Sequence, residues 1–239
     1  MLKCLIFDMD DTLYPEREYY RSGFSAVSRF MQEFYGMDAT AAFDVMWNSF
    51  SEGVRKDIFN SAFIAAGIEP DKQMVSRVLD VFRNHRPDIS LPEDTRAVLD
   101  VLGGDFRLAM LSNGYLPAQQ YKLDALGIEE RFAQVLFTEE LGREFWKPSA
   151  KGFEVLLERL NHTPDECVYI ADNAAWDFAG PKSLGMPTIH VCSPERTQDN
   201  RPPDESYAPD YRINSLLELP ELLIKMRCRC GGCNGGKCQ

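Results

Sequence analysis

Short apolar runs recur along the chain, and the first and fourth of them end in acidic residues. Runs of this kind are typical of strands buried in a parallel sheet. Five of them are present, over residues 3–7, 106–111, 134–137, 167–171 and 188–192. We therefore predict a sheet built from these strands.

Helical patterns lie between most of the predicted strands. Apolar side chains at the i, i+3, i+4 and i+7 positions of one buried helix face are Phe153, Leu156, Leu157 and Leu160. Two further helices are predicted over 116–126 and 177–184, because Gly127 and Gly185 stand where glycine commonly ends a helix. Strands that alternate with helices in this way indicate an α/β domain with a parallel sheet.

Between Pro15 and roughly Pro87 the apolar positions repeat only at helical spacing. Four stripes occur: Phe24, Val27, Met31 and Phe34; Phe43, Met46, Trp47 and Phe50; Val54, Ile58 and Ala62; Val75, Val78, Leu79 and Phe82. We interpret most of these side chains as core packing. Together they predict a four-helix module inserted after the first strand, with a return linker over 86–92. The predicted parts are a core over 1–14 and 88–225, a helical insertion over 15–87 and a cysteine-rich tail over 226–239.

The chain of 239 residues carries 37 acidic and 26 basic residues, which gives a formal charge of −11. A negative overall field disfavours nucleic acid polymers and anionic membranes as partners. No stretch approaches the ~20 apolar residues of a membrane helix, and no signal-peptide pattern is seen at the N-terminus. We therefore expect a soluble, cytoplasmic protein. The sequence gives no indication of its oligomeric state.

Acidic residues follow two of the predicted strands. Asp8 and Asp10 come after the first strand, and Asp172 comes after the fourth, with Asp177 five residues further on. In an open parallel sheet, ligands bind beyond the carboxyl ends of the strands. Carboxylates gathered there repel one another unless a hard cation lies among them, and oxygen ligands of this kind suit magnesium. The sequence therefore predicts a Mg²⁺ site at this edge of the sheet.

Polar and cationic residues complete the predicted site. Ser112 and Asn113 follow the second strand, and Lys147 lies just before the helix that leads to the fourth. A lysine in this place supplies the cation that a phosphate group or an aspartate anion needs.

Four segments resemble, in their order, the motifs of the haloacid dehalogenase superfamily. They are Asp-Met-Asp-Asp-Thr-Leu (8–13), Leu-Ser-Asn-Gly (111–114), Lys-Pro (147–148) and Ile-Ala-Asp-Asn-Ala-Ala-Trp-Asp (170–177). Each motif alone is a weak signal, but the ordered set at strand ends is a strong one. The resemblance runs from about Lys3 to Leu223 and implies a three-layer Rossmann-like core with an α-helical cap of the C1 type. The segment Thr-Leu-Tyr-Pro (12–15) also looks like the pyrimidine 5′-nucleotidase branch.

The resemblance implies a role for each acidic residue. Asp8 is then the nucleophile that forms an aspartyl-phosphate, and Asp10 is the general acid to the leaving group and later the general base to water. Mg²⁺ is held by the Asp8 carboxylate, the Asp10 backbone carbonyl and Asp172. Asp177 supports the metal indirectly or through water, and Thr12 orients the loop.

The resemblance also implies how the phosphoryl group is held. The Ser112 hydroxyl and the Asn113 backbone amide donate to phosphoryl oxygens, and Lys147 pairs with Asp8 and phosphate. Two positions depart from the family pattern, because glycine is common where this chain has Asp11 and Ala171. We expect Asp11 to face solvent rather than substrate, and we expect alanine to be tolerated at the second position.

An acid at Asp10 favours phosphate ester chemistry, since dehalogenases and phosphonate-cleaving members of the superfamily lack it. We predict a phosphatase that acts on a small phosphomonoester, with a nucleoside monophosphate as the first candidate and a sugar phosphate or phosphoglycolate as the second. A phosphomutase shares all four motifs and is the nearest enzyme alternative. Tyr19, Tyr20, Arg21 and Phe24 could stack on a base or grip a second anionic group, but packing and a solvated charge explain them equally well.

Four cysteines crowd the end of the chain: Cys228, Cys230, Cys233 and Cys238. Four thiolates can hold zinc or an iron–sulfur cluster, although the paired Cys-x2-Cys spacing occurs only once among them. The tail is therefore either a metal site or a reduced segment that binds nothing. A non-catalytic protein whose working part is this tail is the alternative from another class.

The remaining cysteines and the histidines are expected to be structural. Three cysteines in strand-like runs are predicted to be buried, reduced thiols: Cys4, Cys167 and Cys192. The histidines lie at the end of the helical insertion, in a loop and in the fifth strand, as His85, His162 and His190.

Overall fold

The computed structural model describes residues 1–192 and 201–230, with side chains through residue 227. These residues fall into two compact units. The first, called the sheet unit, consists of Met1–Pro15, Leu91–Gly114 and the described residues from Gly127 onward. The second, called the helical unit, consists of Glu16–Ser90 and Tyr115–Leu126.

The described part of the sheet unit contains a parallel sheet in the order β3-β2-β1-β4-β5-β6. Its strands are β1 (Cys4–Phe7), β2 (Arg107–Ser112), β3 (Gln134–Phe137), β4 (Cys167–Ala171), β5 (Thr188–Val191) and β6 (Tyr211–Ile213). The first five strands were predicted. β6 was not predicted, because three residues are too few to show an alternating pattern of apolar positions.

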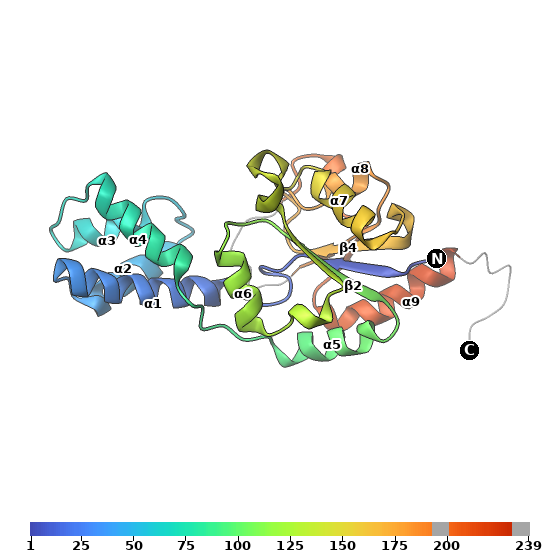
Figure 1. Ribbon diagram of the computed structural model, residues 1–239, viewed down its shortest axis with the longest axis horizontal. Coiled ribbons are helices and arrows are strands. Elements are labelled where there is room, and N and C mark those ends of the chain that lie inside the picture. Colours follow the sequence, from blue (N-terminus) through green and yellow to red (C-terminus); the bar gives the residue numbers. More distant parts are fainter. Residues whose placement is uncertain (193–200, 231–239) are drawn as a thin grey trace. The chain divides into compact units, whose positions relative to one another are not determined.

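Helices cover both faces of this sheet (Figure 1). α5 (Glu93–Gly103) and α9 (Leu219–Cys230) pack together on one face, and α7 (Lys151–Leu160) and α8 (Ala179–Ser183) lie on the other. The predicted three-layer α/β core is thereby confirmed. Short 3₁₀ helices are η1 (Glu129–Arg131), η2 (Thr138–Leu141), η3 (Arg143–Phe145), η4 (Pro164–Glu166), η5 (Glu205–Tyr207) and η6 (Leu216–Glu218).

The central strands are apolar throughout because both of their faces are covered. Every residue of β1 and of β4 is fully buried. On one face, Phe153 of α7 packs edge-on against the ring of Tyr169, with 4.8 Å between the ring centroids. β1 and β4 are parallel neighbours in the sheet, and their carboxyl ends carry the acidic residues singled out above.

The helical unit is formed by five helices among the described residues. They are α1 (Glu16–Tyr35), α2 (Ala39–Ser51), α3 (Ile58–Ala65), α4 (Lys72–Asn84) and α6 (Ala118–Leu126). Most residues of the four predicted stripes pack into its core, as Phe24, Met46 and Val78 do. Phe34 and Val54 do not, since they are 56% and 41% exposed.

α6 belongs to the helical unit, although the sequence analysis placed its residues with the core. The Lys122 ammonium lies 3.7 Å from the Glu16 carboxylate and 4.1 Å from the centre of the Tyr19 ring. The Arg86 guanidinium lies 4.1 Å from the centre of the Tyr121 ring. These charge–charge and cation–π contacts with α1 and with the segment after α4 account for the grouping.

Gly23 allows α1 and α4 to approach closely. A methyl group at this position would come within 2.4 Å of the Phe82 ring. We expect Gly23→Ala to lower the free energy of unfolding by about 1–3 kcal/mol, the usual cost of overpacking, despite the higher helix propensity of alanine. Denaturant unfolding measures the change. Gly103→Ala is the control, because its methyl group meets only ordinary contacts at 3.7 Å and should not destabilise.

The predicted tail is described only in part. α9 continues to Cys230, so Cys228 and Cys230 lie on a helix, while Cys233 and Cys238 lie outside the described residues. The proposed four-thiolate site therefore stays a prediction. None of the helices in the described ranges is long and apolar enough to cross a membrane.

The strand cysteines follow the prediction with one exception. Cys4 and Cys167 are buried free thiols on the neighbouring strands β1 and β4. Cys192 is free but only partly buried, because it follows the last residue of β5 rather than lying inside the strand.

Candidate active site

Two buried aspartates lie at the carboxyl edge of the sheet. Asp8 directly follows β1 and Asp172 directly follows β4, and these strands are neighbours in the sheet. The Asp8 backbone N–H donates to the Ile170 carbonyl at 2.9 Å, so the pairing of β1 with β4 continues one residue beyond the end of β1. The two aspartates are 5% and 6% exposed. The position matches the expected ligand edge of an open parallel sheet.

Lys147 is the buried cation of this site. Its ammonium nitrogen lies 2.7 Å from Asp8 Oδ1 and 2.6 Å from Asp177 Oδ1. It also donates to the Tyr169 hydroxyl oxygen at 2.9 Å. Burial alone would lower the pKa of Lys147, but the carboxylates of Asp177 and Asp8 raise it well above its usual value. The side chain is therefore a permanent cation beside Asp8.

Carboxylates outnumber cations in the same region. Burial, together with the negative charges of Asp177 and Asp10, raises the pKa of Asp8 to about 7, although Lys147 opposes the shift. Burial and the charges of Asp177, Asp8 and Asp11 raise the pKa of Asp172 well above its usual value. One lysine does not neutralise these carboxylates. Their oxygen atoms are the ligands that Mg²⁺ prefers, so the donor set fits this ion.

The metal set that the sequence predicted contains only two carboxylates, those of Asp8 and Asp172, with the Asp10 backbone carbonyl as the third ligand. The described residues contain no group of three or more His, Cys, Asp or Glu side chains arranged to hold a metal ion, so this metal set stays a prediction. A site of this composition leaves coordination positions for water and for phosphate oxygens, as is usual for Mg²⁺.

Asn113 fixes the backbone around Lys147. Its side-chain oxygen accepts hydrogen bonds from the Lys147 backbone N–H at 2.9 Å and from the Thr138 hydroxyl at 2.8 Å. Its side-chain amide donates to the Lys147 carbonyl at 3.3 Å. Ser112, the last residue of β2, is 1% exposed beside it. The segments after β2 and before α7 are thus joined, which positions the lysine for Asp8.

The loop after β1 places Asp10 differently from Asp8. Asp10 is half-buried, and the hydroxyl of Tyr14 donates to its Oδ1 at 2.6 Å. The loop closes in a tight turn, in which the Leu13 N–H donates to the Met9 carbonyl at 2.9 Å. The Asp10 carboxylate is therefore oriented by a neighbour in its own loop rather than by Lys147.

Asp11 corrects one of our expectations. It was expected to face solvent, but it is only 9% exposed and lines a hollow of about 410 Å³ together with Thr12 and Asn214. Its backbone is left-handed, with φ 54°, as the tight turn of the loop requires. Aspartate tolerates this conformation better than most residues, which explains how it replaces glycine. The Thr12 hydroxyl is buried and has no hydrogen-bond partner among the described residues.

Asp177 and His190 hold other parts of the site in place. Asp177, for which we expected an indirect contact with the metal, pairs with Lys147 and accepts hydrogen bonds from the Asn173 N–H at 2.9 Å and the Tyr169 hydroxyl at 3.2 Å. His190 Nε2 lies 2.6 Å from the Asp172 carbonyl, to which it donates. A structural role for His190 agrees with the sequence analysis.

Three residues of the site were not predicted from the sequence: Tyr14, Thr138 and Tyr169. Tyr169 reads as one more apolar residue of a buried strand, yet its hydroxyl contacts both Lys147 and Asp177. Burial raises the pKa of Tyr169 well above its usual value, so the hydroxyl stays protonated and donates. The only indication in the sequence was that Tyr169 carries a hydroxyl group inside a buried strand that ends at the site.

We expect Tyr169→Phe to lower kcat about tenfold with little change in KM. The ring and its packing on Phe153 remain, but Lys147 loses one of the three oxygens that orient its ammonium group. Steady-state kinetics measure the effect. Tyr121→Phe, a change on α6, is the matched control. An unchanged kcat in Tyr169→Phe would show that Asp8 and Asp177 orient the lysine without help.

The residues considered for substrate contact mostly pack within the helical unit. Tyr19 is 5% and Phe24 is 1% exposed, and both rings contact Phe82. Tyr20 packs 4.4 Å from Phe50, measured between ring centroids. Arg21 is exposed, with its guanidinium 6.0 Å from the centre of the Trp47 ring. Packing is therefore a sufficient explanation for Tyr19 and Phe24.

Known proteins resemble this chain over most of its length. The haloacid dehalogenase-like hydrolase family matches residues 2–185. A glyceraldehyde 3-phosphate phosphatase of Methanopyrus kandleri is 28% identical, over 95% of this chain and 99% of that protein. Pyrimidine 5′-nucleotidase YjjG of Escherichia coli is 25% identical, over 92% and 97%. The magnesium-bound structure of the HAD-hydrolase YfnB from Bacillus subtilis has the same fold, with a TM-score of 0.65 and 20% identity over 93% of this chain and 98% of the other.

Proposed function

The chain belongs to the haloacid dehalogenase-like hydrolase family, and from this premise we propose that it is a magnesium-dependent phosphatase of small phosphorylated metabolites. The observation that carries the proposal is the buried ion pair between Asp8 and Lys147 beside Asp172. A nucleophilic carboxylate, a fixed cation and an excess of buried carboxylates are what an aspartyl-phosphate mechanism requires.

Asp10 supports phosphate ester cleavage over dehalogenation. An alkoxide is a poor leaving group and needs a proton, whereas a halide ion does not. Asp10 is half-buried and oriented by Tyr14, in the same loop as Asp8. In our proposal it protonates the leaving oxygen and then removes a proton from the attacking water.

Each remaining residue has a defined task. Asp8 attacks the phosphorus atom, and Lys147 holds the Asp8 carboxylate and pairs with a phosphoryl oxygen. The Ser112 hydroxyl and the Asn113 backbone amide donate to the other phosphoryl oxygens. Asp8, the Asp10 carbonyl and Asp172 would hold Mg²⁺, which would supply positive charge to balance that of the phosphoryl group. The water that hydrolyses the aspartyl-phosphate is activated by Asp10.

The substrate is proposed to be a nucleoside monophosphate or a sugar phosphate. One relative is named for glyceraldehyde 3-phosphate and another for pyrimidine nucleotides, and both align with nearly the whole chain. Both substrates are phosphate monoesters, so the common site at the sheet edge serves either one. The family's phosphatases and mutases differ in product, which makes product analysis decisive.

The test is phosphate release from a panel of nucleoside monophosphates, sugar phosphates, triose phosphates and phosphoglycolate, with Mg²⁺ or with excess chelator. We expect one class of monoester to release inorganic phosphate, and we expect chelator to abolish release. Ca²⁺ should inhibit, because its larger, looser coordination engages both oxygens of the nucleophilic carboxylate.

Three results contradict parts of the proposal. Full turnover in excess chelator excludes the metal site. Isomerised product without free phosphate identifies a mutase. Chloride release from 2-chloropropionate, with no phosphate release from any ester, identifies a dehalogenase.

A further inference from the structure

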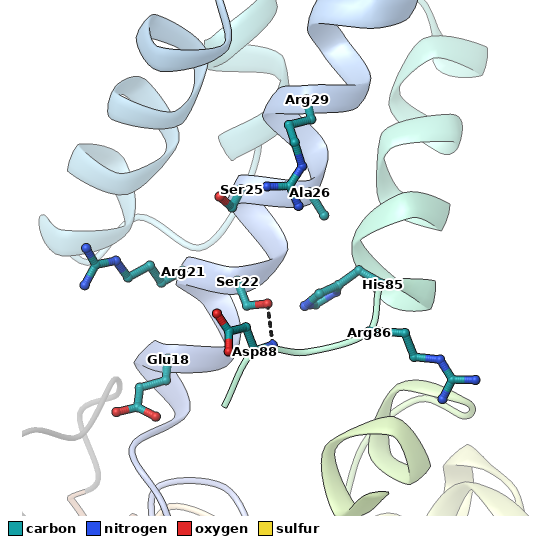
Figure 2. A pocket seen from close by; sticks show the side chains of 9 residues that line it. All are labelled: Glu18, Arg21, Ser22, Ser25, Ala26, Arg29, His85, Arg86 and Asp88. Atoms are coloured by element: carbon teal, nitrogen blue, oxygen red, sulfur yellow. Dashed lines mark hydrogen bonds between the residues drawn. The ribbon is translucent and has the colours of Figure 1, made fainter. Parts of the chain in front are cut away.

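The helical unit contains a hollow of about 490 Å³ that none of the roles above uses. It lies between α1 and the segment that follows α4, and all of its lining residues belong to this unit (Figure 2). The volume falls in the range of pockets that hold small metabolites. Acidic, hydroxyl-bearing and basic residues line different parts of its wall.

One face of α1 runs along the hollow. Glu18, Ser22, Ser25 and Arg29 follow one another at spacings of four, three and four residues, so they lie on one side of the helix. The helix rises about 16 Å from the first to the last of them. The stripe therefore has a carboxylate at one end, hydroxyl groups in the middle and a guanidinium group at the other end.

The opposite wall strengthens the acidic end. Asp88 lies beside Ser22, and its backbone N–H donates to the Ser22 hydroxyl oxygen at 2.8 Å. Figure 2 shows the Arg29 guanidinium turned toward Ser25, while Arg21 extends away from the hollow. The two carboxylates and the inward-facing guanidinium are thus separated along the hollow.

These charges are not neutralised by protein partners. Among the residues that the structure describes, Glu18, Asp88 and Arg29 form no ion pair, although they share one hollow. The Ser25 hydroxyl also donates no hydrogen bond to Glu18 or Asp88. The Ser22 hydroxyl, which accepts from Asp88, keeps its own proton available.

His85 lines the same hollow and is its only titratable ring among the described residues. Its Nδ1 lies 2.6 Å from the Phe82 carbonyl oxygen, which can only accept, so Nδ1 carries the proton. Burial lowers the pKa of His85, and the charges of Lys122 and Arg29 lower it further, although the hydrogen bond to Phe82 opposes the shift. In the neutral ring Nε2 carries no proton, and this atom is buried and has no hydrogen-bond partner among the described residues.

We propose that this hollow binds a small amphoteric metabolite, which carries an ammonium group and a carboxylate or phosphate group. The ammonium group lies at the end formed by the carboxylates of Glu18 and Asp88. The anionic group lies at the end formed by Arg29 and the Ser25 hydroxyl. A simple cation would leave Arg29 unpaired and a simple anion would leave both carboxylates unpaired, so a ligand of both signs is the complementary one.

The test uses the full-length protein and three matched probes: 6-aminohexanoate, hexanoate and hexylammonium. Binding is followed by proton NMR on the imidazole signal of His85. The chain has three histidines, so His85→Gln assigns this signal. We expect 6-aminohexanoate to shift it saturably, and we expect each single-charge probe to bind at least about tenfold more weakly.

Two variants locate the ligand. Arg29→Met and Asp88→Asn should each weaken binding of 6-aminohexanoate at least about tenfold, since each removes one charged contact. Both side chains are exposed, so folding should be unaffected. Arg77→Met, at an exposed position of α4, is the matched control and should bind as the parent does.

Other outcomes overturn the proposal. Equal affinity for hexanoate identifies an anion site, and equal affinity for hexylammonium identifies a cation site. If no probe shifts the His85 signal saturably, or if Arg29→Met and Asp88→Asn bind as the parent does, the hollow holds only solvent. The measurement does not use phosphate release, so it is independent of the proposed phosphatase activity.

Discussion

Asp8→Asn should abolish turnover, with a loss of about 10⁵-fold or more in kcat, and should leave no phosphoenzyme. The amide is nearly the same size as the carboxylate but cannot attack phosphorus. Losses of this order are typical when an enzyme loses its nucleophile. Phosphate release and intact-protein mass after acid quenching measure the two effects.

The fold should tolerate this change. Lys147 keeps Asp177 at 2.6 Å and the Tyr169 hydroxyl at 2.9 Å, so its charge stays paired after Asp8 is neutralised. Removal of one of several crowded carboxylates also relieves repulsion, because the charge of Asp8 contributes to the raised pKa of Asp172. Thermal unfolding should therefore show a Tm at or above that of the parent protein.

A matched control separates loss of the nucleophile from loss of a carboxylate in general. Asp105→Asn changes an exposed residue just before β2, at the opposite edge of the sheet. It should retain parental activity. Residual activity in Asp8→Asn, or a phosphoryl adduct on another residue such as Ser112, would refute the assignment of the nucleophile.

The fold was predictable because its signals are local and repeated. Strands such as β1 and β4 are apolar at every position, since helices cover both faces of the sheet, and their ends carry acidic residues. β6 was not predicted, because three residues are too few to show the alternation of apolar and polar positions that indicates a strand. The grouping of α6 with the helical unit depends on contacts of Lys122 and Tyr121 with residues about 35–106 positions earlier, which periodicity does not record.

The candidate site was predictable in its residues but not in its pairings. Charged residues at strand ends pointed to Asp8 and Asp172, and Lys147 was singled out as the cation just before the helix that leads to β4. The contact of Asp177 with Lys147 depends on the rotation of two side chains, which no spacing encodes. Tyr169 was not predicted for a different reason. In the pattern of a buried strand a tyrosine is indistinguishable from an apolar residue, and only the structure shows that its hydroxyl contacts Lys147.

The burial of Asp11 shows a limit of reading exposure from residue type. An aspartate in a loop is usually solvated, so the expectation followed the average behaviour of the residue. The turn that brings Asp8 and Asp10 to the site closes within a few residues, through the hydrogen bond from Leu13 to Met9. This compact turn, and not the polarity of Asp11, determines its exposure.

Asp10→Asn should separate the two chemical steps. The variant keeps the nucleophile and the backbone carbonyl of residue 10, which is the proposed metal ligand. The new side chain should also stay in place, because the amide oxygen of asparagine can accept the hydrogen bond that Tyr14 donates at 2.6 Å. Only the proton donor and the base are removed.

The expected effects depend on the leaving group. An aryl phosphate leaves without much acid help, so Asp8 should be phosphorylated at a rate close to that of the parent protein. An alkyl phosphate needs the proton, so its first step should slow by about 10²–10⁴-fold. Hydrolysis of the aspartyl-phosphate needs the base in both cases. With an aryl substrate the variant should therefore accumulate phosphoenzyme while turnover nearly stops.

Intact-protein mass after rapid mixing and acid quenching measures this accumulation as one added phosphoryl group, and peptide mapping should place it on Asp8. Tyr14→Phe is the informative companion, since it leaves Asp10 in place but removes the hydrogen bond that orients it. It should slow both steps without trapping the adduct. Parental turnover by Asp10→Asn, or equal loss with aryl and alkyl substrates and no adduct, would show that Asp10 is neither the acid nor the base.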